Sequence, residues 1–385
     1  MTAFSSNGKP KVLIIGEVDT NFASFKQFAE HFDYELYQIS TKEKLIEDFK
    51  TIYSDISAIW AMWMGFIPVG GLRGEVLEAV PVSVKIITSC AAGFDSYDAK
   101  GLADRGIVLC NTPGLAAEPV ADHVLYLTLS LFRYYHVFER LTRAYQHTID
   151  PRRMLTTSSW DLEAGKPKIF DDKRNEADYS FETNSSITPA KFAFGELVAG
   201  RFVKTPKGHS VGILGFGAIG KEIGRKLNAI GMNVHYSKRT ALTDEEEKEL
   251  GYPATFHKEI KDLFENSQLL VLACPLNAGT HYVVNEESLK FLPKEARIIN
   301  IGRGALINTQ AMLAALKSGH LHGVGLDVFE KEPIVEEELC KRWDVIIEPH
   351  IGSSTLENVE LSEKNCADNI YNMILGDGKS LTRVN

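Results

Sequence analysis

The sequence predicts an α/β protein made of two doubly wound parallel-sheet domains. Short apolar runs, which are typical of buried parallel strands, alternate with helix-like stretches along most of the chain. This alternation occurs twice, in one series that begins near Lys11 and in a second that begins near Ser210. A length of 385 residues is sufficient for two domains of ordinary size, so each series is expected to form its own domain.

Composition and charge exclude several classes of protein. Hydrophobic residues make up 44% of the chain, and no apolar run reaches the ~18–20 residues of a membrane-spanning helix. The 42 Lys and Arg residues against 51 Asp and Glu residues give a net charge of −9 without a basic block, which argues against a nucleic-acid partner. The five cysteines are scattered and contain no C-x-x-C pair, which argues against a disulfide framework and a metal site. The N-terminus has no apolar signal segment, so a cytoplasmic protein is expected.

The first series opens with an apolar run over residues 11–16. Its further elements are predicted as strands at residues 56–60, 85–88 and 106–110, and as helices at residues 23–31 and 42–53. The turn after the first strand, Gly16-Glu17-Val18, lacks a glycine fingerprint, so this domain is not expected to bind a dinucleotide.

The middle of the chain combines a helical pattern with a polar stretch. Apolar residues at helical spacing predict one long helix over residues 118–143. Residues 147–189 are polar and have few evenly spaced apolar positions. Because a loop of this length is uncommon inside a compact domain, we interpret it as a surface insertion with ordered segments around Trp160 and Phe170.

The second series has six predicted strands. They lie at residues 210–214, 232–236, 269–273, 297–301, 323–326 and 345–347, with helices at residues 219–230 and 309–318 between them. A last helix is predicted over residues 356–375. We expect this helix to return to the first domain, so that the second unit is inserted into the first and the active site lies in the cleft between them.

A phosphate-binding turn follows the first strand of the second series. The sequence Gly215-Phe216-Gly217-Ala218-Ile219-Gly220 has the G-x-G-x-x-G pattern between a strand and a helix, which is the context of a dinucleotide-binding turn. Gly215 permits the turn, Gly217 allows the backbone to approach a diphosphate, and Gly220 allows the helix to pack closely on the strand. The helix N-terminus supplies N–H groups to the diphosphate.

The end of the next strand indicates which dinucleotide binds. An NAD-specific domain has a carboxylate there, about 20 residues after the glycines, to bind the ribose hydroxyls. This chain has Ser237, Lys238 and Arg239 instead, a hydroxyl and two cations that suit a 2′-phosphate. The residues favour NADP(H), with NAD(H) possible; the alternative is that Lys238 and Arg239 belong to a solvated loop.

Three charged residues follow strand ends of the second series in otherwise apolar surroundings. They are Arg303 after the strand at 297–301, Glu332 after that at 323–326, and His350 after that at 345–347. Open α/β sheets bind ligands at this edge. Singly, each residue has an ordinary structural explanation, but together they provide a carboxylate-binding cation, a proton donor and an acid to tune that donor, as carbonyl reduction requires.

These blocks resemble the D-isomer-specific 2-hydroxyacid dehydrogenases. The resemblance rests on the glycine turn and on the segments Asn300-Ile301-Gly302-Arg303-Gly304, Gly325-Leu326-Asp327-Val328-Phe329, Glu332-Pro333, Pro349-His350-Ile351-Gly352, Ala92-Gly93-Phe94-Asp95, Asn111-Thr112-Pro113-Gly114 and Val120-Ala121-Asp122. It covers nearly the whole chain except residues 147–189, and it extends to fungal D-mandelate-dehydrogenase-like members and to glyoxylate and hydroxypyruvate reductases.

The resemblance implies a flavodoxin-like substrate domain (residues 1–130 and 352–385) and a Rossmann NAD(P)-binding domain (residues 131–351). It also implies a cytoplasmic homodimer that reduces a 2-keto acid to the D-2-hydroxy acid. In this assignment His350 is the general acid/base, Glu332 raises its pKa and orients it, and Arg303 binds the substrate carboxylate.

The resemblance also implies the binding residues. The cofactor would be held by the glycine turn with Ala218 and Ile219, by Ser237, Lys238 and Arg239, and by Cys274, Pro275, Thr280, Ile301, Gly302, Asp327 (to the nicotinamide carboxamide) and Gly352. The substrate would be held by backbone N–H groups of Ala91, Ala92 and Gly93 and by Trp63 and Met64. The loop Cys90-Ala91-Ala92-Gly93 departs from the usual glycine-rich form, and Trp60, Met62, Trp63, Met64 and Phe66 suit either an ordinary core or a pocket for an aromatic substrate.

Two other functions remain open at this point. The first is a dinucleotide-sensing protein similar to the corepressors of this fold, which keep the same three charged residues. The second is a D-3-phosphoglycerate dehydrogenase, which is disfavoured because no regulatory domain follows the last helix and because Ser237-Lys238-Arg239 suggests NADPH.

Overall fold

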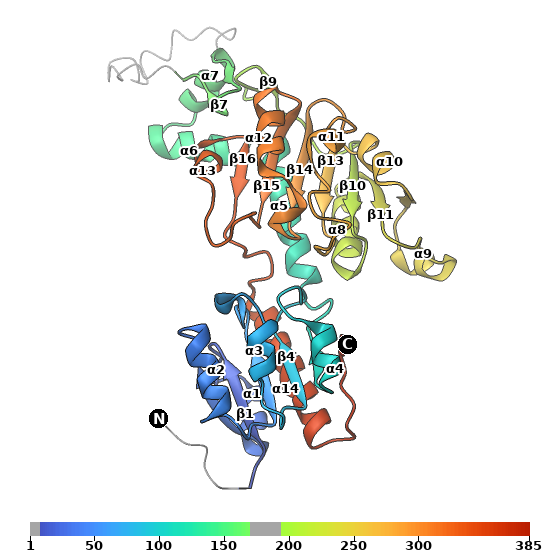
Figure 1. The fold of residues 1–385 in the computed structure, drawn as a ribbon. Coiled ribbons are helices and arrows are strands. Elements are labelled where there is room, and N and C mark those ends of the chain that lie inside the picture. Colours follow the sequence, from blue (N-terminus) through green and yellow to red (C-terminus); the bar gives the residue numbers. More distant parts are fainter. Residues whose placement is uncertain (1–7, 170–193) are drawn as a thin grey trace. The chain divides into compact units, whose positions relative to one another are not determined.

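The structure is a computed structural model that describes residues 8–169 and 194–385. The chain forms two compact units, of which unit 1 is Met1–Pro119 with Ser353–Asn385, and unit 2 is Val120–Gly352 (Figure 1). The chain therefore leaves unit 1, builds unit 2 and returns. The sequence placed the boundary at residue 131, but the structure places it at residue 120, near the start of α5 (Ala117–Arg133), because the apolar residues of this helix belong to the core of unit 2.

Unit 1 contains a five-stranded parallel sheet in the order β2-β1-β3-β4-β5. The strands are β1 (Lys11–Ile15), β2 (Asp33–Tyr37), β3 (Ala58–Ala61), β4 (Ile86–Ser89) and β5 (Val108–Cys110). This is the flavodoxin-like strand order, so the predicted fold class is confirmed for this unit. The edge strand β2 was not predicted, because Asp33 and Glu35 interrupt its apolar run.

Helices cover both faces of the unit 1 sheet. They are α1 (Ala23–His31), α2 (Lys42–Lys50), α3 (Gly74–Ala79), α4 (Ala99–Asp104) and α14 (Leu356–Ile374), with a 3-10 turn at Ile67–Val69. The side chains of β1 alternate between two cores, with Leu13 on the face of α2 and α3 and Ile14 on the face of α1 and α14. The last helix, α14, packs against α1 and β4, so the end of the chain completes the unit that its beginning started.

Unit 2 contains a seven-stranded parallel sheet in the order β12-β11-β10-β13-β14-β15-β16. The strands are β10 (Ser210–Leu214), β11 (Asn233–Ser237), β12 (Ala254–Phe256), β13 (Leu269–Leu272), β14 (Ala296–Asn300), β15 (Leu321–Leu326) and β16 (Val345–Ile347). All six predicted strands are confirmed, with ends that differ by two residues at most. Strand β12 was not predicted.

The unit 2 sheet is also covered on both faces. Besides α5, the helices that follow the sheet strands are α8 (Ala218–Ala229), α9 (Asp244–Leu250), α10 (Ile260–Glu265), α11 (Glu286–Leu289), α12 (Thr309–Lys317) and α13 (Glu337–Lys341), with a 3-10 turn at Gly304–Leu306. The switch point of this sheet lies between β10 and β13, where the strand order reverses, and open α/β sheets bind nucleotides there.

The prediction of one continuous helix over residues 118–143 is wrong. The structure has α5 and then α6 (Tyr135–Tyr145), separated by Tyr134 in the left-handed region with a φ of +54°. The last carbonyls of α5 are satisfied from outside the helix, since Leu131 O accepts from Arg297 Nε at 3.2 Å and Phe132 O accepts from Lys204 N at 3.2 Å. The ring of Tyr134 is buried and its hydroxyl contacts His322.

The described part of the polar stretch at 147–189 is more ordered than predicted. It forms α7 (Asp150–Thr157) and a small hairpin of β6 (Trp160–Asp161) and β7 (Lys166–Pro167), and a second hairpin follows with β8 (Leu197–Val198) and β9 (Arg201–Phe202). Leu155 is fully buried in a small core with α6. Ordered structure near Trp160 is confirmed, whereas Phe170 lies outside the described residues.

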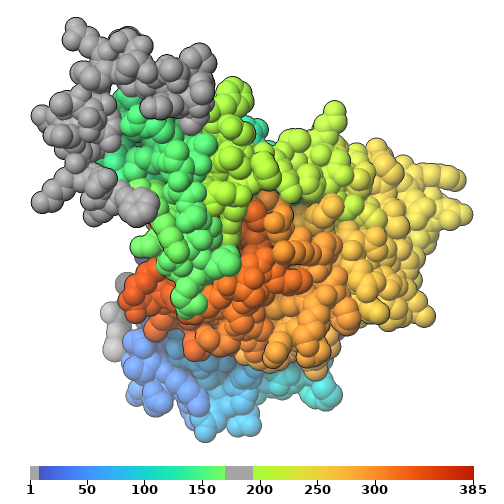
Figure 2. Space-filling view, turned by 90° about the horizontal axis from the view of Figure 1, so that it is seen from above, coloured from blue at the N-terminus to red at the C-terminus, as the bar shows by residue number. Residues whose placement is uncertain are grey.

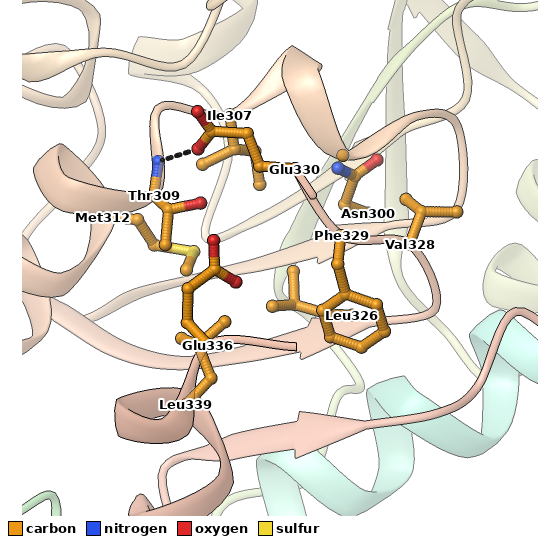
Figure 3. Close-up of a pocket in the computed structure, with 11 residues that line it drawn as sticks. Asn300, Ile307, Thr309, Met312, Leu326, Val328, Phe329, Glu330, Glu336 and Leu339 are labelled. Carbon is orange, nitrogen blue, oxygen red and sulfur yellow. Dashed lines mark hydrogen bonds between the residues drawn. The ribbon is translucent and has the colours of Figure 1, made fainter. Parts of the chain in front are cut away.

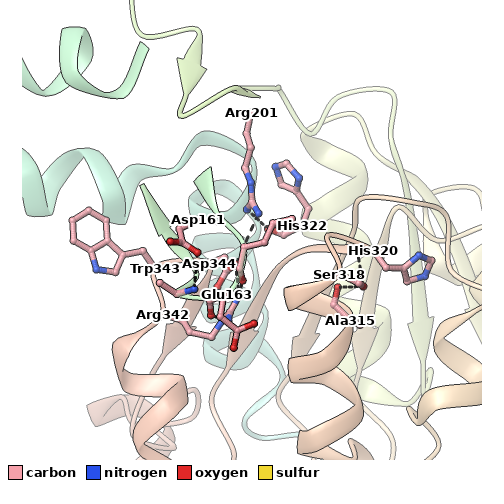
Figure 4. A network of polar contacts seen from close by, with 12 residues as sticks. Asp161, Glu163, Arg201, Ala315, Ser318, His320, His322, Arg342, Trp343 and Asp344 are labelled. Carbon is pink, nitrogen blue, oxygen red and sulfur yellow. Dashed lines mark hydrogen bonds and ion pairs between the residues drawn. The ribbon is translucent and has the colours of Figure 1, made fainter. Parts of the chain in front are cut away.

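A buried polar network ties this insertion to the sheet (Figure 4). Arg342 pairs with Asp344 at 2.9 Å and donates to the carbonyl oxygens of Leu162 at 3.1 Å and Glu163 at 2.9 Å in the β6–β7 hairpin. Because both charged side chains are almost fully buried and hydrogen-bonded, the hairpin is firmly held. In the space-filling view the green part of the chain accordingly lies against the orange part (Figure 2).

Two features that are absent from the described residues bear on function. No helix among residues 8–169 and 194–385 is long and apolar enough to cross a membrane. Over the same residues, no group of three or more His, Cys, Asp or Glu side chains is placed to hold a metal ion.

Candidate active site

The glycine turn between β10 and α8 has the form that the sequence predicted. Gly215 has a φ of +98°, and a Cβ atom there would lie 2.6 Å from the backbone of Ala273 and Cys274, so only glycine fits. A Cβ atom on Gly220 would lie 2.1 Å from the carbonyl oxygen of Gly215. This close approach brings α8 directly onto the strand, as a dinucleotide-binding turn requires.

The N-terminus of α8 is suited to a diphosphate. Gly217 is the N-cap residue, and its side chain position is open space within 4 Å. No side chain caps the helix, so the N–H groups of its first turn, at Ala218 and Ile219, face outward without a capping oxygen. These features fit a dinucleotide, because its diphosphate would take the place of the cap.

The end of β11 carries the predicted cations. Ser237 is buried and its carbonyl oxygen accepts from Gly215 N at 2.9 Å, which fixes the strand end beside the glycine turn. Lys238 is half-buried and Arg239 is exposed. The acid Glu246 on α9 is occupied by Lys221 at 3.0 Å and by its own capping box with Thr243.

The loop after β13 holds three further predicted cofactor residues. The hydroxyl of Thr280 donates to the carbonyl oxygen of Pro275 at 2.7 Å, which closes the loop. Burial raises the pKa of the Cys274 thiol to about 11, so this thiol is neutral. A Cβ atom on Gly302 would lie 2.9 Å from the carbonyl oxygen of Cys274, so the loops after β13 and β14 touch.

Arg303 lies directly after β14, and its backbone is held in place by Asn300. The side chain of Asn300 donates to the carbonyl oxygen of Arg303 at 2.8 Å and accepts from Gly302 N at 3.1 Å. Ile301 N donates to the carbonyl oxygen of Leu272 at 3.2 Å, which joins this turn to β13. The guanidinium of Arg303 donates to the carbonyl oxygen of Gly302 at 2.8 Å.

Gly304 brings the Arg303 turn against the loop that carries Glu332. A Cβ atom on Gly304 would lie 1.9 Å from the carbonyl group of Phe329 and 2.3 Å from Glu330 N, so the two backbones are in direct contact. Glu330 anchors this loop, because its carboxylate accepts from Thr309 N at 3.1 Å (Figure 3). The same carboxylate also accepts from the hydroxyl of Tyr282.

The small cavity beside Glu330 is not a ligand pocket. Its lining includes Asn300, Thr309, Met312, Phe329 and Glu336 (Figure 3). Its volume of about 10 Å³ is room for a single water molecule. A substrate or cofactor cannot bind there.

Glu332 and His350 form a hydrogen-bonded pair, as the sequence reasoning expected. The distance from His350 Nδ1 to Glu332 Oε2 is 3.0 Å, and the second carboxylate oxygen of Glu332 accepts from Phe329 N at 2.9 Å. Both side chains are part-exposed. Since Glu332 occupies Nδ1, the opposite nitrogen, Nε2, is the one that can face a substrate.

The pair shifts both pKa values towards the charged states. The hydrogen bond to Glu332 raises the pKa of His350, an effect that burial opposes and that the charges of Glu332 and Asp327 reinforce. For Glu332, burial raises the pKa, but the bonds from His350 and from Phe329 N outweigh it, so its pKa is lowered. His350 is therefore held as an imidazolium to higher pH than an isolated histidine.

Asp327 fixes the backbone turn that presents His350. His350 has a φ of +58°, an uncommon conformation for a histidine, and the carboxylate of Asp327 accepts from the next two N–H groups, Ile351 at 2.8 Å and Gly352 at 3.0 Å. A Cβ atom on Gly352 would lie 2.9 Å from this carboxylate, so glycine is required. Both oxygens of Asp327 are thus engaged by the protein, and a bond to a nicotinamide carboxamide would have to share one of them.

Sequence reasoning missed His123. This residue lies on α5, and its Nε2 atom is buried 3.5 Å from Asp327 Oδ1. The sequence offered one indication of its importance, because His123 is a polar residue directly beside Val120, Val124 and Leu127, the apolar positions of the predicted helix. The structure shows that this ring packs behind the turn of His350.

The predicted substrate residues all lie in unit 1. Ala91, Ala92 and Gly93 form a half-buried loop after β4, and Trp63 and Met64 are exposed in the loop after β3. The other members of the aromatic and methionine cluster, Trp60, Met62 and Phe66, are buried in the cores. Only Trp63 and Met64 are therefore available to a ligand.

Comparison with known proteins identifies the family. Residues 195–352 match the model of the D-isomer specific 2-hydroxyacid dehydrogenase NAD-binding domain. The chain is 31% identical to the glyoxylate reductase of Pyrococcus furiosus, over 94% of this chain and 91% of the relative. The chain belongs to the D-isomer specific 2-hydroxyacid dehydrogenase family. It is accordingly an oxidoreductase with an NAD(P)-binding domain.

Two solved structures show the same two-domain fold. D-mandelate dehydrogenase of Rhodotorula graminis in its holo form matches with a TM-score of 0.80 and 27% identity, over 98% of this chain and 97% of that one. An NADPH-dependent glyoxylate/hydroxypyruvate reductase of Sinorhizobium meliloti, in complex with NADP and malonate, matches with a TM-score of 0.72 and 25% identity, over 98% and 97%. The recognition of the family and of the fold class from sequence is confirmed.

Proposed function

We propose that this protein reduces a 2-keto acid to the corresponding D-2-hydroxy acid with NADPH as the preferred cofactor. The observation that carries the proposal is the His350–Glu332 pair at 3.0 Å, placed after strand ends of the unit that also holds the glycine turn and Arg303. Glyoxylate, hydroxypyruvate and aryl 2-keto acids are the candidate substrates, in keeping with the names of the relatives.

Different residues of unit 2 bind different parts of the cofactor. The uncapped N-terminus of α8 holds the diphosphate, and Lys238 and Arg239 bind the 2′-phosphate. Thr280, Gly302 and Asp327 belong to the loops that would hold the nicotinamide end of the cofactor. When bound, NADPH supplies the hydride that reduces the carbonyl carbon.

The charged residues supply the remaining chemistry. Arg303 binds the substrate carboxylate and draws electron density from the adjacent carbonyl group. His350, as an imidazolium, donates a proton from Nε2 to the carbonyl oxygen as the alkoxide develops, and it accepts that proton in the reverse reaction. Glu332 holds the ring by Nδ1 and stabilises its positive charge, so the donor stays protonated to higher pH than an isolated histidine.

A turnover assay tests the proposal. NADPH oxidation is followed with a panel of 2-keto acids of increasing side-chain size, in the parent protein and in His350→Ala. Because general acid catalysis is worth about 10²–10⁴-fold, kcat should fall by that factor in the variant, while the dissociation constant for NADPH stays within about twofold. No turnover of any 2-keto acid by the parent, with NADPH still bound, would favour a dinucleotide-sensing role instead.

A further inference from the structure

The segment that follows α14 covers the edge of the unit 1 sheet. It runs antiparallel to the edge strand β5, with Val384 N donating to the carbonyl oxygen of Leu109 at 2.8 Å and a β-bridge between Cys110 and Arg383. Its last residue, Asn385, accepts from Leu109 N at 2.9 Å and donates to Ala99 of α4, beside which the chain ends in Figure 1. We call residues 381–385 the edge segment.

One buried amide of α14 fixes the edge segment in register. Asn369 is fully buried, and its Oδ1 atom accepts from Leu381 N at 2.8 Å and Thr382 N at 3.1 Å. Its Nδ2 atom donates to the hydroxyl of Thr382 at 3.1 Å and to the carbonyl oxygen of Asn365 at 2.7 Å. Both donor hydrogens and both acceptor sites of Asn369 are thus used, and a fully satisfied buried amide of this kind specifies one arrangement of the chain.

The edge segment is linked through Thr382 to the turn after β5. The hydroxyl of Thr382 donates to the carbonyl oxygen of Asn111 at 2.6 Å, and the amide of Asn365 donates to the same oxygen at 3.0 Å. Asn111 N in turn donates to the carbonyl oxygen of Thr382 at 3.3 Å. Asn111 is buried, so these hydrogen bonds are shielded from water.

Asn111 and its neighbour hold two successive carbonyl groups of the loop at residues 91–93. The side chain of Asn111 donates to the carbonyl oxygen of Ala92 at 2.7 Å, and Thr112 N donates to the carbonyl oxygen of Ala91 at 3.2 Å. A peptide group is planar, with its N–H pointing opposite to its C=O. Fixing these two carbonyls therefore fixes the directions of the following N–H groups, those of Ala92 and Gly93.

These two N–H groups are free to bind an anion. Among the hydrogen bonds of the described residues, none is donated by Ala92 N or Gly93 N. Two adjacent backbone N–H groups that point to the same side form an anion-binding concavity. We propose that the edge segment, through Thr382 and Asn111, positions residues 91–93 to bind the carboxylate of the 2-keto acid. This inference rests on the proposed function, and Thr382 and Asn111 act as positioning residues.

Replacing the Thr382 hydroxyl tests the inference. Thr382→Val keeps the shape of the side chain but removes the hydroxyl that donates to Asn111 O and accepts from Asn369 Nδ2, whereas Thr382→Ser retains it. Lys379→Ala changes an exposed residue just before the edge segment. In Thr382→Val we expect faster amide hydrogen exchange at residues 90–94 and a KM for the keto acid about 3–10-fold higher, because the hydrogen bonds that hold the loop at residues 91–93 are weakened. The value of kcat should stay within about threefold, because a carboxylate contact is made equally in the ground and transition states.

The measurements distinguish the inference from the proposed function. The dissociation constant for NADPH should be unchanged in all variants, and Thr382→Ser and Lys379→Ala should match the parent in both exchange and KM. Parent-like exchange at residues 90–94 together with parent-like KM in Thr382→Val overturns the positioning role while the proposed function stands. Faster exchange in Thr382→Val than in the parent, together with a parent that reduces no keto acid, supports the hold on the loop and rejects the proposed substrate.

A second variant keeps the test valid if Thr382→Val does not fold. Asn111→Ala removes the donor to Ala92 but leaves the edge segment in contact with α14. It should raise the KM for the keto acid by a similar factor. An unchanged KM in a folded Asn111→Ala protein, judged by far-ultraviolet circular dichroism, contradicts the inference.

Discussion

Gly304 offers a sharp test of the idea that the loops bearing Arg303 and Glu332 must touch. In Gly304→Ala the new Cβ atom would lie 1.9 Å from the carbonyl group of Phe329, whereas carbon atoms in contact are separated by about 3.5 Å or more. The two backbones must therefore separate by roughly 1.5 Å. Glu330 resists this movement because it is bonded to Thr309 N and to Tyr282.

The separation should affect both activity and stability. Since a misplacement of about 1 Å can cost about 10²-fold in rate, kcat should fall by about two orders of magnitude. Overpacking of this kind costs about 1–3 kcal/mol, which lowers Tm by roughly 2–12 °C in a domain of this size. The N-terminus of α8 and the cations after β11 are not altered, so the dissociation constant for NADPH should change much less than kcat.

The assay compares kcat, NADPH binding and Tm in the parent, Gly304→Ala and Gly279→Ala. Gly279 is the matched control, because a Cβ atom there meets no atom closer than Asn277 Oδ1 at 3.3 Å. The control should retain activity within about threefold. A Gly304→Ala protein with parental kcat and Tm would refute the claim that direct backbone contact sets the distance between the two loops.

Three further predictions concern charge. In Glu332→Gln the pKa of His350 should fall, because the hydrogen bond to the carboxylate is what raises it. Since reduction needs the imidazolium, the high-pH limb of the kcat/KM profile should move to lower pH, and an unmoved limb would contradict the assigned pairing of Glu332 with His350. Lys238→Ala combined with Arg239→Ala should weaken NADPH by about 1–3 kcal/mol and leave NADH unaffected, as measured by titration of each dinucleotide. Burial raises the pKa of Glu363 to about 7, above its value in the unfolded chain, so the folded state is favoured while this carboxyl group is protonated. The free energy of unfolding should therefore decline by up to ~3 kcal/mol as the pH rises from about 4.5 to 7, and chemical unfolding of Glu363→Gln should no longer show this decline.

Much of the site was readable in the sequence, because its residues follow strand ends. The glycine turn, Arg303, Glu332 and His350 each come directly after an apolar run, and parallel strands deliver such positions to the same edge of the sheet. The chemistry of the pair was also readable, because a histidine near a glutamate at that edge suits proton transfer. Family, fold class and these positions needed no long-range contacts for their recognition.

Other features depend on contacts that no local pattern reveals. The break at Tyr134 interrupts a continuous helical pattern, and Arg297 and Lys204, which are distant in the sequence, satisfy the carbonyls freed there. Leu155 lies in a polar stretch, yet it is fully buried against α6. The link from Thr382 to Asn111 joins residues 271 positions apart in the chain, so neither residue alone suggested a role.

The insertion of unit 2 into unit 1 has a consequence for folding in the cell. During synthesis, residues 120–352 emerge as an uninterrupted stretch that contains every strand of the seven-stranded sheet. The strands of unit 1 emerge before unit 2, but the face of β4 that α14 covers and the edge of β5 that residues 381–385 cover stay open until the residues that follow unit 2 have also emerged. Unit 1 therefore starts to emerge before unit 2 and is completed after it, and an uncovered strand edge is a site where unfinished chains can pair with one another.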